Sequence, residues 1–128
     1  MHGLHLTADL RGCPGGQPLL TDVEALRALC LGQVARAGLQ AVNTLFHRFD
    51  AGAEPAGITG VVLLAESHLA VHTWPELGAV TLDVYVCNFS ADHGAAAHAL
   101  MDTLIAAFGP TEVQRHALQR GTLSPQAA

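Results

Sequence analysis

Apolar stretches with the spacing of β-strands recur along the chain. Residues 58–65 and 79–87 are nearly continuous runs of apolar and β-branched side chains, which is typical of buried strands. Residues 4–10, 39–49 and 111–118 are also interpreted as strands, and the polar stretch between the two buried runs is an optional further strand. The pattern therefore predicts a sheet of at least five strands.

Helical spacing interrupts this pattern twice. Thr21 and Glu24 are spaced as a capping box, in which each side chain satisfies a free backbone N–H, so we expect a helix that begins there and ends at Gly38. A second helix is predicted from about residue 91 to residue 108, where a Gly-Pro pair stops it. The apolar stripes are Val23, Leu26, Cys30 and Ala37 on the first helix and Ala97, Leu100, Leu104 and Phe108 on the second.

The order of these elements predicts the fold class. One strand and a helix are followed by several strands, a second helix and a last strand. This order favours an α+β, two-layer α/β sandwich, with two helices covering one face of a mainly antiparallel sheet. With 128 residues, the chain is expected to form a single domain over residues 1–128.

Composition narrows the classes of function. The net charge is −5, with only six Lys and Arg residues, which argues against a nucleic-acid partner. No apolar run is long enough to span a bilayer, and no signal peptide is apparent. The three cysteines are widely spaced and odd in number, which suits a reducing cytoplasm. Because only 13% of the residues are charged, we expect part of the surface to be buried in an oligomer.

The stretch from Ala65 to Glu76 concentrates the reactive side chains, with two acids, a hydroxyl, two imidazoles and an indole. If Pro75 to Gly78 is a hairpin loop, Cys87 falls opposite Glu66 and beside Ser67, since opposing positions keep a fixed register. Ser67 and His72 are an odd number of positions apart, so on a flat strand they face opposite ways. If they act together, the backbone has to bend between them.

The same stretch resembles the signature of the short prokaryotic S-adenosylmethionine decarboxylase proenzymes. Further similarity lies in residues 46–49 (Phe-His-Arg-Phe), 57–62 (Gly-Ile-Thr-Gly-Val-Val) and 82–87 (Leu-Asp-Val-Tyr-Val-Cys). The resemblance extends from Gly3 to Gly121, and a twelve-residue signature with a Cys downstream is highly specific.

The resemblance implies a lyase that is made as a zymogen and cuts itself between Glu66 and Ser67. The Ser67 hydroxyl attacks the Glu66 carbonyl carbon, and His72 is the base that removes the Ser67 α-proton. The products are residues 1–66 and residues 67–128, the second capped by a pyruvoyl group derived from Ser67. This covalent cofactor forms a Schiff base with S-adenosylmethionine and accepts electrons as CO2 leaves. The product donates aminopropyl groups in spermidine synthesis.

The resemblance also assigns the other site residues. Cys87 is similar in position to the proton donor of the decarboxylation, and Thr59 to a Ser that assists processing by a hydrogen bond. Phe49 and Trp74 resemble the aromatic walls of the substrate pocket, and Glu76 the acid that binds ribose hydroxyls. The family's active site lies at a homodimer interface and uses no metal.

The sequence departs from the family pattern in three places. Thr59 carries a methyl group that the family's usual Ser lacks. Asn88 stands where a Gly usually follows the Cys, and Asn tolerates the left-handed backbone that such a position takes. The loop over residues 50–57 is longer than usual. Because Asp50 and Glu54 could pair with a guanidinium or ammonium group, a pyruvoyl-dependent arginine or ornithine decarboxylase is an alternative. Thr59 and Asn88 motivate another, a processing-dead binding or regulatory relative.

Residue patterns alone leave other interpretations open. His68 and His72 are spaced as a metal pair on a helix, although Trp74 and Pro75 favour strand and turn. Ser67, His72 and Asp83 could form a hydrolase triad, although no Gly-x-Ser-x-Gly motif is present. Cys87 and Cys30 could be plain buried thiols, and Trp74 a core or interface residue. The histidines assigned to the surface or to structure are His47, His93, His98 and His116.

Overall fold

The computed structural model describes residues 2–49, 52, 56–88 and 91–121 of the chain. Within them, six strands form one sheet in the order β2-β3-β4-β5-β1-β6, and each neighbouring pair is antiparallel. The strands are β1 (Gly3–Arg11), β2 (Ala41–Arg48), β3 (Ile58–Leu64), β4 (Ser67–Trp74), β5 (Ala79–Cys87) and β6 (Glu112–Arg120). The helices are α1 (Val23–Arg36), α2 (Gly94–Phe108) and the short 3-10 helices η1 (Pro18–Leu20) and η2 (Pro75–Leu77).

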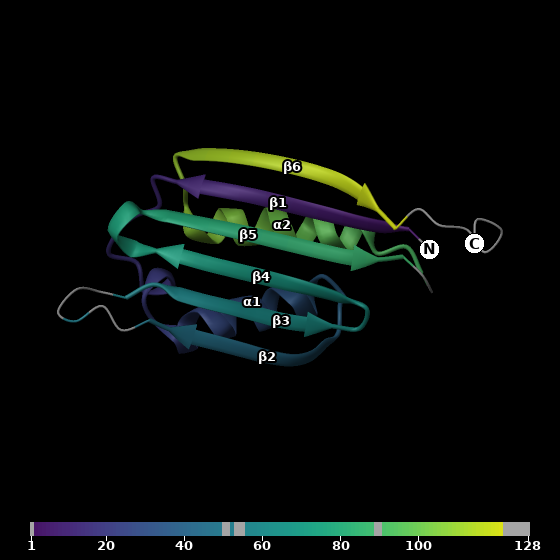
Figure 1. The fold of residues 1–128 in the computed structure, drawn as a ribbon, viewed down its shortest axis with the longest axis horizontal. Coiled ribbons are helices and arrows are strands. Elements are labelled where there is room, and N and C mark those ends of the chain that lie inside the picture. Colours follow the sequence, from purple (N-terminus) through teal and green to yellow (C-terminus); the bar gives the residue numbers. More distant parts are fainter. Residues whose placement is uncertain (1, 50–51, 53–55, 89–90, 122–128) are drawn as a thin grey trace.

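Both α-helices lie on the same face of the sheet, behind the strands in Figure 1. Alternate strand side chains point to that face, where Leu69 and Leu82 join Leu26 of α1 and Leu104 of α2 in one buried cluster. The predicted α+β two-layer sandwich, with two helices on one face, is thereby confirmed. No described helix is long and apolar enough to cross a membrane.

Helix α1 begins differently from the prediction. Its N-cap is Asp22, whose carboxylate accepts hydrogen bonds from the backbone N–H groups of Glu24 and Ala25. Thr21 instead ends η1, where its N–H donates to the Pro18 carbonyl. The capping box was therefore wrong, because Pro18 starts a 3-10 turn that includes Thr21 and delays the helix.

Two turns at the ends of β4 position the reactive stretch. Leu64 pairs with Ser67, so the link from β3 is a two-residue turn in which Glu66 has a φ of 63°. At the other end, η2 and Gly78, with a φ of 59°, lead into β5, and Trp74 pairs with Ala79 as the expected register requires. The optional strand is thus a full member of the sheet.

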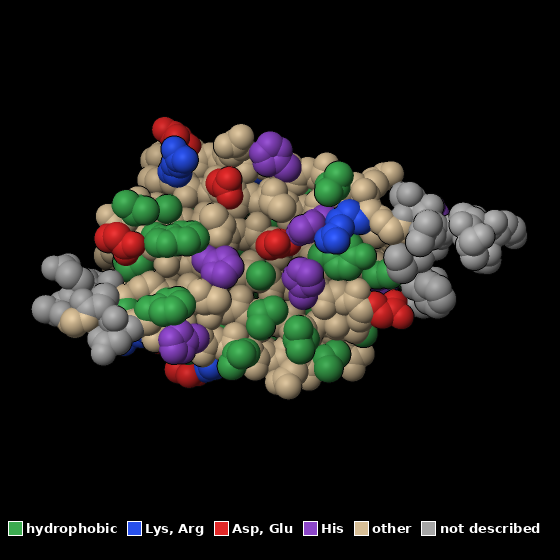
Figure 2. Space-filling view, in the orientation of Figure 1, with side chains coloured by type: hydrophobic (Ala, Val, Ile, Leu, Met, Phe, Trp, Pro, Cys, Tyr) green, Lys and Arg blue, Asp and Glu red, His purple; other side chains and the backbone are tan. Residues whose placement is uncertain are grey.

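The second face of the sheet carries no described helix, and Figure 2 shows the side chains spread over it. We call it the open face. Large apolar side chains remain exposed there, among them Leu45 at 72% and Leu118 at 59%. Strand alternation directs five histidines to this face: His5, His47, His68, His72 and His116. Such an apolar and titratable surface is unusual for an isolated chain.

Candidate active site

The predicted site residues separate into two groups at the two ends of β4. Glu66, Ser67 and Cys87 lie where β4 begins and β5 ends; we call this the cleavage end. The second group lies where β4 ends, and we call it the pocket end. Its members are Phe49, Thr59, His72, Trp74 and Glu76.

The cleavage end combines an unfavourable backbone with a fixed hydroxyl. Among the described residues, Glu66 is the one non-glycine residue with a left-handed φ, a conformation that costs an L-residue about 1–2 kcal/mol. The Ser67 hydroxyl accepts a hydrogen bond from the Cys87 backbone N–H at 3.1 Å. The expected juxtaposition of Cys87 and Ser67 across the β4–β5 ladder is therefore confirmed. β4 runs without interruption from Ser67 to Trp74, so the backbone does not bend between Ser67 and His72.

The pocket end encloses a hollow of about 850 Å³, within the range of small-molecule sites. All five predicted residues of this group line it. Trp74 and Phe49 are 38% and 51% exposed, so their rings are available to a ligand. The ring of His72 lies 6.0 Å from that of Trp74, measured between centroids.

Thr59 and His72 form a pair across the β3–β4 ladder. They are register partners, and the Thr59 hydroxyl lies 3.0 Å from Nδ1 of His72. The extra methyl group of Thr59 thus leaves its hydrogen bond intact. A hydroxyl on Nδ1 orients the imidazole, and Nε2 remains available for proton transfer.

Five further residues, which the sequence did not single out, line the hollow: Gly15, Gly57, Ile58, Thr73 and Pro75. Thr73 is buried, and its hydroxyl accepts from the Ile58 N–H and donates to the Leu20 carbonyl. A Cβ on Gly57 would lie 2.2 Å from the Thr73 carbonyl oxygen, so only glycine fits there. The sequence marked Gly15, Gly57 and Pro75 only as turn signals, and Ile58 and Thr73 only as strand positions.

The two groups do not meet within one chain. Ser67 and His72 are five positions apart on β4, which is roughly 16 Å along a strand. Their odd spacing also directs them to opposite faces, as expected: His72 lies on the open face, and Ser67 shares the parity of the buried Leu69. A single chain therefore cannot place the His72 imidazole on Ser67.

The distances around Asp83 and along β4 argue against the hydrolase triad and the histidine metal pair. Asp83 contacts His5 and lies near His68, not His72, so no Ser67–His72–Asp83 triad forms. His68 and His72 are four strand positions apart, roughly 13 Å, which is too far for a shared ion. The described residues contain no cluster of three or more metal-type side chains. Asp50 and Glu54 lie outside the described residues.

Asn88 does not use the left-handed backbone that its substitution for Gly suggested. Its side-chain oxygen instead accepts a hydrogen bond from the His93 N–H, just before α2. That expectation was wrong, because Asn88 acts through its amide in the connection to α2. Cys30, by contrast, behaves as predicted for an inert core thiol, since burial raises its pKa to about 12.

A sequence model of the S-adenosylmethionine decarboxylase family matches residues 4–121 of the chain. The chain belongs to the S-adenosylmethionine decarboxylase family. Two similar family members are named S-adenosylmethionine decarboxylase proenzyme. The one from Aquifex aeolicus is 37% identical over 98% of this chain and 85% of its own length. The one from Persephonella marina is 37% identical over 94% and 84%.

The fold agrees with membership of this decarboxylase family. The crystal structure of the adenosylmethionine decarboxylase from Aquifex aeolicus superposes on this chain with a TM-score of 0.82 at 36% identity. The match covers 96% of this chain and 93% of that one. The resemblance noted in the sequence is thereby confirmed at the level of family and fold.

Proposed function

We propose that the chain is a pyruvoyl-dependent S-adenosylmethionine decarboxylase that makes its own cofactor by cutting between Glu66 and Ser67. Residues 1–66 and 67–128 are then the two chains of the mature cytoplasmic enzyme. The observation that carries the proposal is the left-handed Glu66 directly before Ser67, whose hydroxyl is bonded to the Cys87 N–H. Family membership supports both the reaction and the proenzyme form.

The cleavage uses only groups of the chain and water. The Ser67 oxygen adds to the Glu66 carbonyl carbon, the peptide C–N bond breaks, and an ester links the two residues. His72 removes the Ser67 α-proton, and Glu66 leaves with the ester oxygen as a carboxylate. Water then replaces the amino nitrogen as ammonia, which leaves a ketone on residue 67.

The residues of the cleavage end would fit a pyruvoyl group at position 67. Ser67 starts a strand, so its carbonyl side stays in the sheet while its amino side is free to be cut. The pyruvoyl ketone supplies an electron sink for the carboxylate-bearing carbon. Cys87, whose N–H already contacts the residue 67 hydroxyl, is the proton donor to the product. Phe49 and Trp74 bind the adenine, and Glu76 binds the ribose hydroxyls.

The reaction requires a homodimer in which each site is shared. Ser67, the nucleophile, and His72, the base, lie roughly 16 Å apart along β4. A proton transfer requires the two groups to approach to about 3 Å. A second copy that packs on the open face in the reverse direction brings its cleavage end, where β4 begins, to the first copy's pocket end. The exposed Leu45, Leu63 and Leu118 of the open face support this contact. The product supplies aminopropyl groups for spermidine synthesis.

The denatured mass of freshly purified protein tests the proposal. We expect two fragments divided between Glu66 and Ser67, the second lighter by one ammonia than a fragment beginning with Ser. Release of CO2 from carboxyl-labelled S-adenosylmethionine, with arginine and ornithine in parallel, then tests the substrate. A single uncut chain would contradict the self-processing, and CO2 from arginine or ornithine alone would contradict the substrate.

A further inference from the structure

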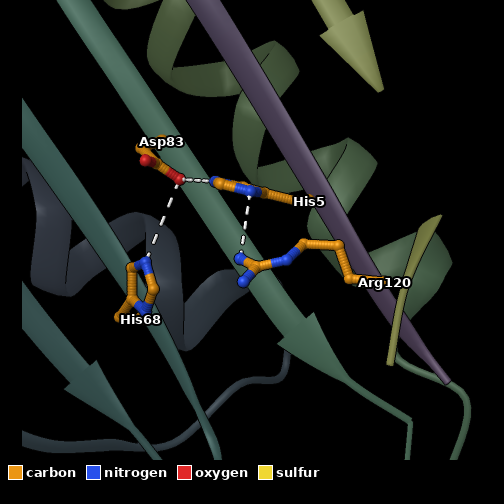
Figure 3. A network of polar contacts seen from close by, with 4 residues as sticks. All are labelled: His5, His68, Asp83 and Arg120. Carbon is orange, nitrogen blue, oxygen red and sulfur yellow. Dashed lines mark hydrogen bonds and ion pairs between the residues drawn. The ribbon is translucent and has the colours of Figure 1, made fainter. Parts of the chain in front are cut away.

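A cluster of polar side chains lies on the open face beside the cleavage end (Figure 3). One carboxylate oxygen of Asp83 contacts Nε2 of His5 and lies 3.9 Å from Nε2 of His68. On the far side of His5, a guanidinium nitrogen of Arg120 lies 3.4 Å from Nδ1. The side chains of His5, Asp83 and His68 are 19%, 38% and 38% exposed, so they are only partly hydrated.

The contacts fix the roles of the His5 nitrogens. A guanidinium only donates hydrogen bonds, so Nδ1 of His5 accepts from Arg120. Nε2 therefore carries the proton and donates to Asp83, in the arrangement that orients an imidazole between a donor and a carboxylate. The side of the Asp83 oxygen that His5 does not occupy faces His68.

Tyr85 completes the surroundings of His68. It is the ladder partner of both His68 and His5, and its ring lies 5.7 Å from the His68 ring and 5.8 Å from the His5 ring. Arg120 stacks on Tyr85 at 5.1 Å. Tyr85 also lies across Gly3, where a Cβ would come within 2.7 Å of its hydroxyl. The His68 ring is thus bounded by an aromatic ring and a carboxylate.

The position of this cluster matters because of what cleavage does to β4. In the uncut chain, the turn at Ala65 and Glu66 connects Ser67 covalently to β3. After cleavage, residue 67 is a chain end, and chain ends fray unless contacts hold them. His68 is the next residue, and its pairing with Tyr85 is the last described rung of the β4–β5 ladder.

We infer that Asp83, through His5 and His68, holds the new chain end after cleavage and so positions the reactive ketone. This inference rests on the proposed self-processing. Asp83 is a positioning residue, since it contacts His5 and lies 3.9 Å from His68, and it does not contact the reacting atoms. Its loss should therefore leave cleavage nearly unchanged, because the intact turn still holds Ser67, but should disorder the mature site.

The test compares Asp83→Asn with Asp102→Asn, a matched change in the exposed Asp102–Arg115 pair between α2 and β6. Three quantities are measured: the self-cleavage rate by mass, the rate at which phenylhydrazine traps the ketone, and kcat and KM. For Asp83→Asn we expect a cleavage rate within about twofold of wild type. Ketone trapping should be about fivefold faster and kcat about tenfold lower, because a displaced reacting group loses alignment. Asp102→Asn should match the wild type throughout.

A pair of His5 variants checks the contact itself. The amide nitrogen of Gln can take the place of Nε2, so His5→Gln should keep kcat and ketone trapping near wild type, whereas His5→Leu should reproduce Asp83→Asn. Wild-type trapping and kcat in Asp83→Asn, or equal losses in both His5 variants, would overturn the inference. Slowed cleavage in proportion to kcat would assign Asp83 a purely structural role. A wild-type chain that forms no ketone would instead refute the proposed function on which the inference rests.

Discussion

Mixing two inactive variants tests the shared site most directly. His72→Ala keeps Ser67 and Cys87 but lacks the base, and Ser67→Ala keeps the base but lacks the nucleophile. Within one chain, Ser67 and His72 are separated by roughly 16 Å along β4, far beyond the 2.6–3.2 Å or so of a proton transfer. Neither variant alone should form the ketone-bearing fragment. In a hybrid dimer, however, one site combines Ser67 of the first variant with His72 of the second.

The expected yield follows from random pairing. With equal amounts of the two chains, about half of the His72→Ala chains enter hybrid dimers of two-fold symmetry, and about half should therefore be cut. Distinct affinity tags separate the hybrids, and denatured mass identifies the cut chain. Cleavage confined to the His72→Ala chain is expected. Isolated hybrids in which neither chain yields the ketone-bearing fragment would refute the shared site, and formation of that fragment by the pure His72→Ala protein would refute the role of His72.

Three further predictions concern single positions. Thr59→Ala should slow self-cleavage about three- to tenfold, because it removes a hydrogen bond to His72 of about 1 kcal/mol. Thr59→Ser keeps that bond and should keep the wild-type rate in a mass time course, so equal rates for the two variants would contradict the pairing. Leu63→Asp on the open face should raise the dimer dissociation constant, measured by sedimentation, at least about tenfold. Val113→Asp, a similar change on the opposite face, should leave it unchanged, and equal effects of the two changes would contradict a dimer contact through the open face. Cys30, with its pKa raised to about 12 by burial, is protonated in the fold and ionises near pH 9 when unfolded, so the free energy of unfolding should fall as pH rises from 9 toward 12, by up to about 1.4 kcal/mol per pH unit. Replacement of Cys30 by Ala should remove that part of the pH dependence.

The candidate site was predictable where it depended on local sequence. The hairpin between β4 and β5 follows from Pro75 and Gly78, so the contact between Ser67 and Cys87 could be expected from register alone. The pairing of Thr59 with His72 has the same origin in the β3–β4 hairpin. The start of α1 was not predictable from its capping motif, because Pro18 three residues earlier begins a competing 3-10 turn.

The sequence by itself determined the order of strands and helices, the apolar faces that make the core, and the short-range hairpins, because each depends on periodicity and turn residues within about twenty positions. Only the tertiary structure decided that β1 lies between β5 and β6, which brings His5 to Asp83 and Arg120 to His5 across long stretches of the chain. It also decided that Ser67 and His72 lie at opposite ends of one strand, and that the face carrying His72 is left uncovered by the described helices. Long-range pairing of strands is set by the packing of the whole core, which no local pattern encodes.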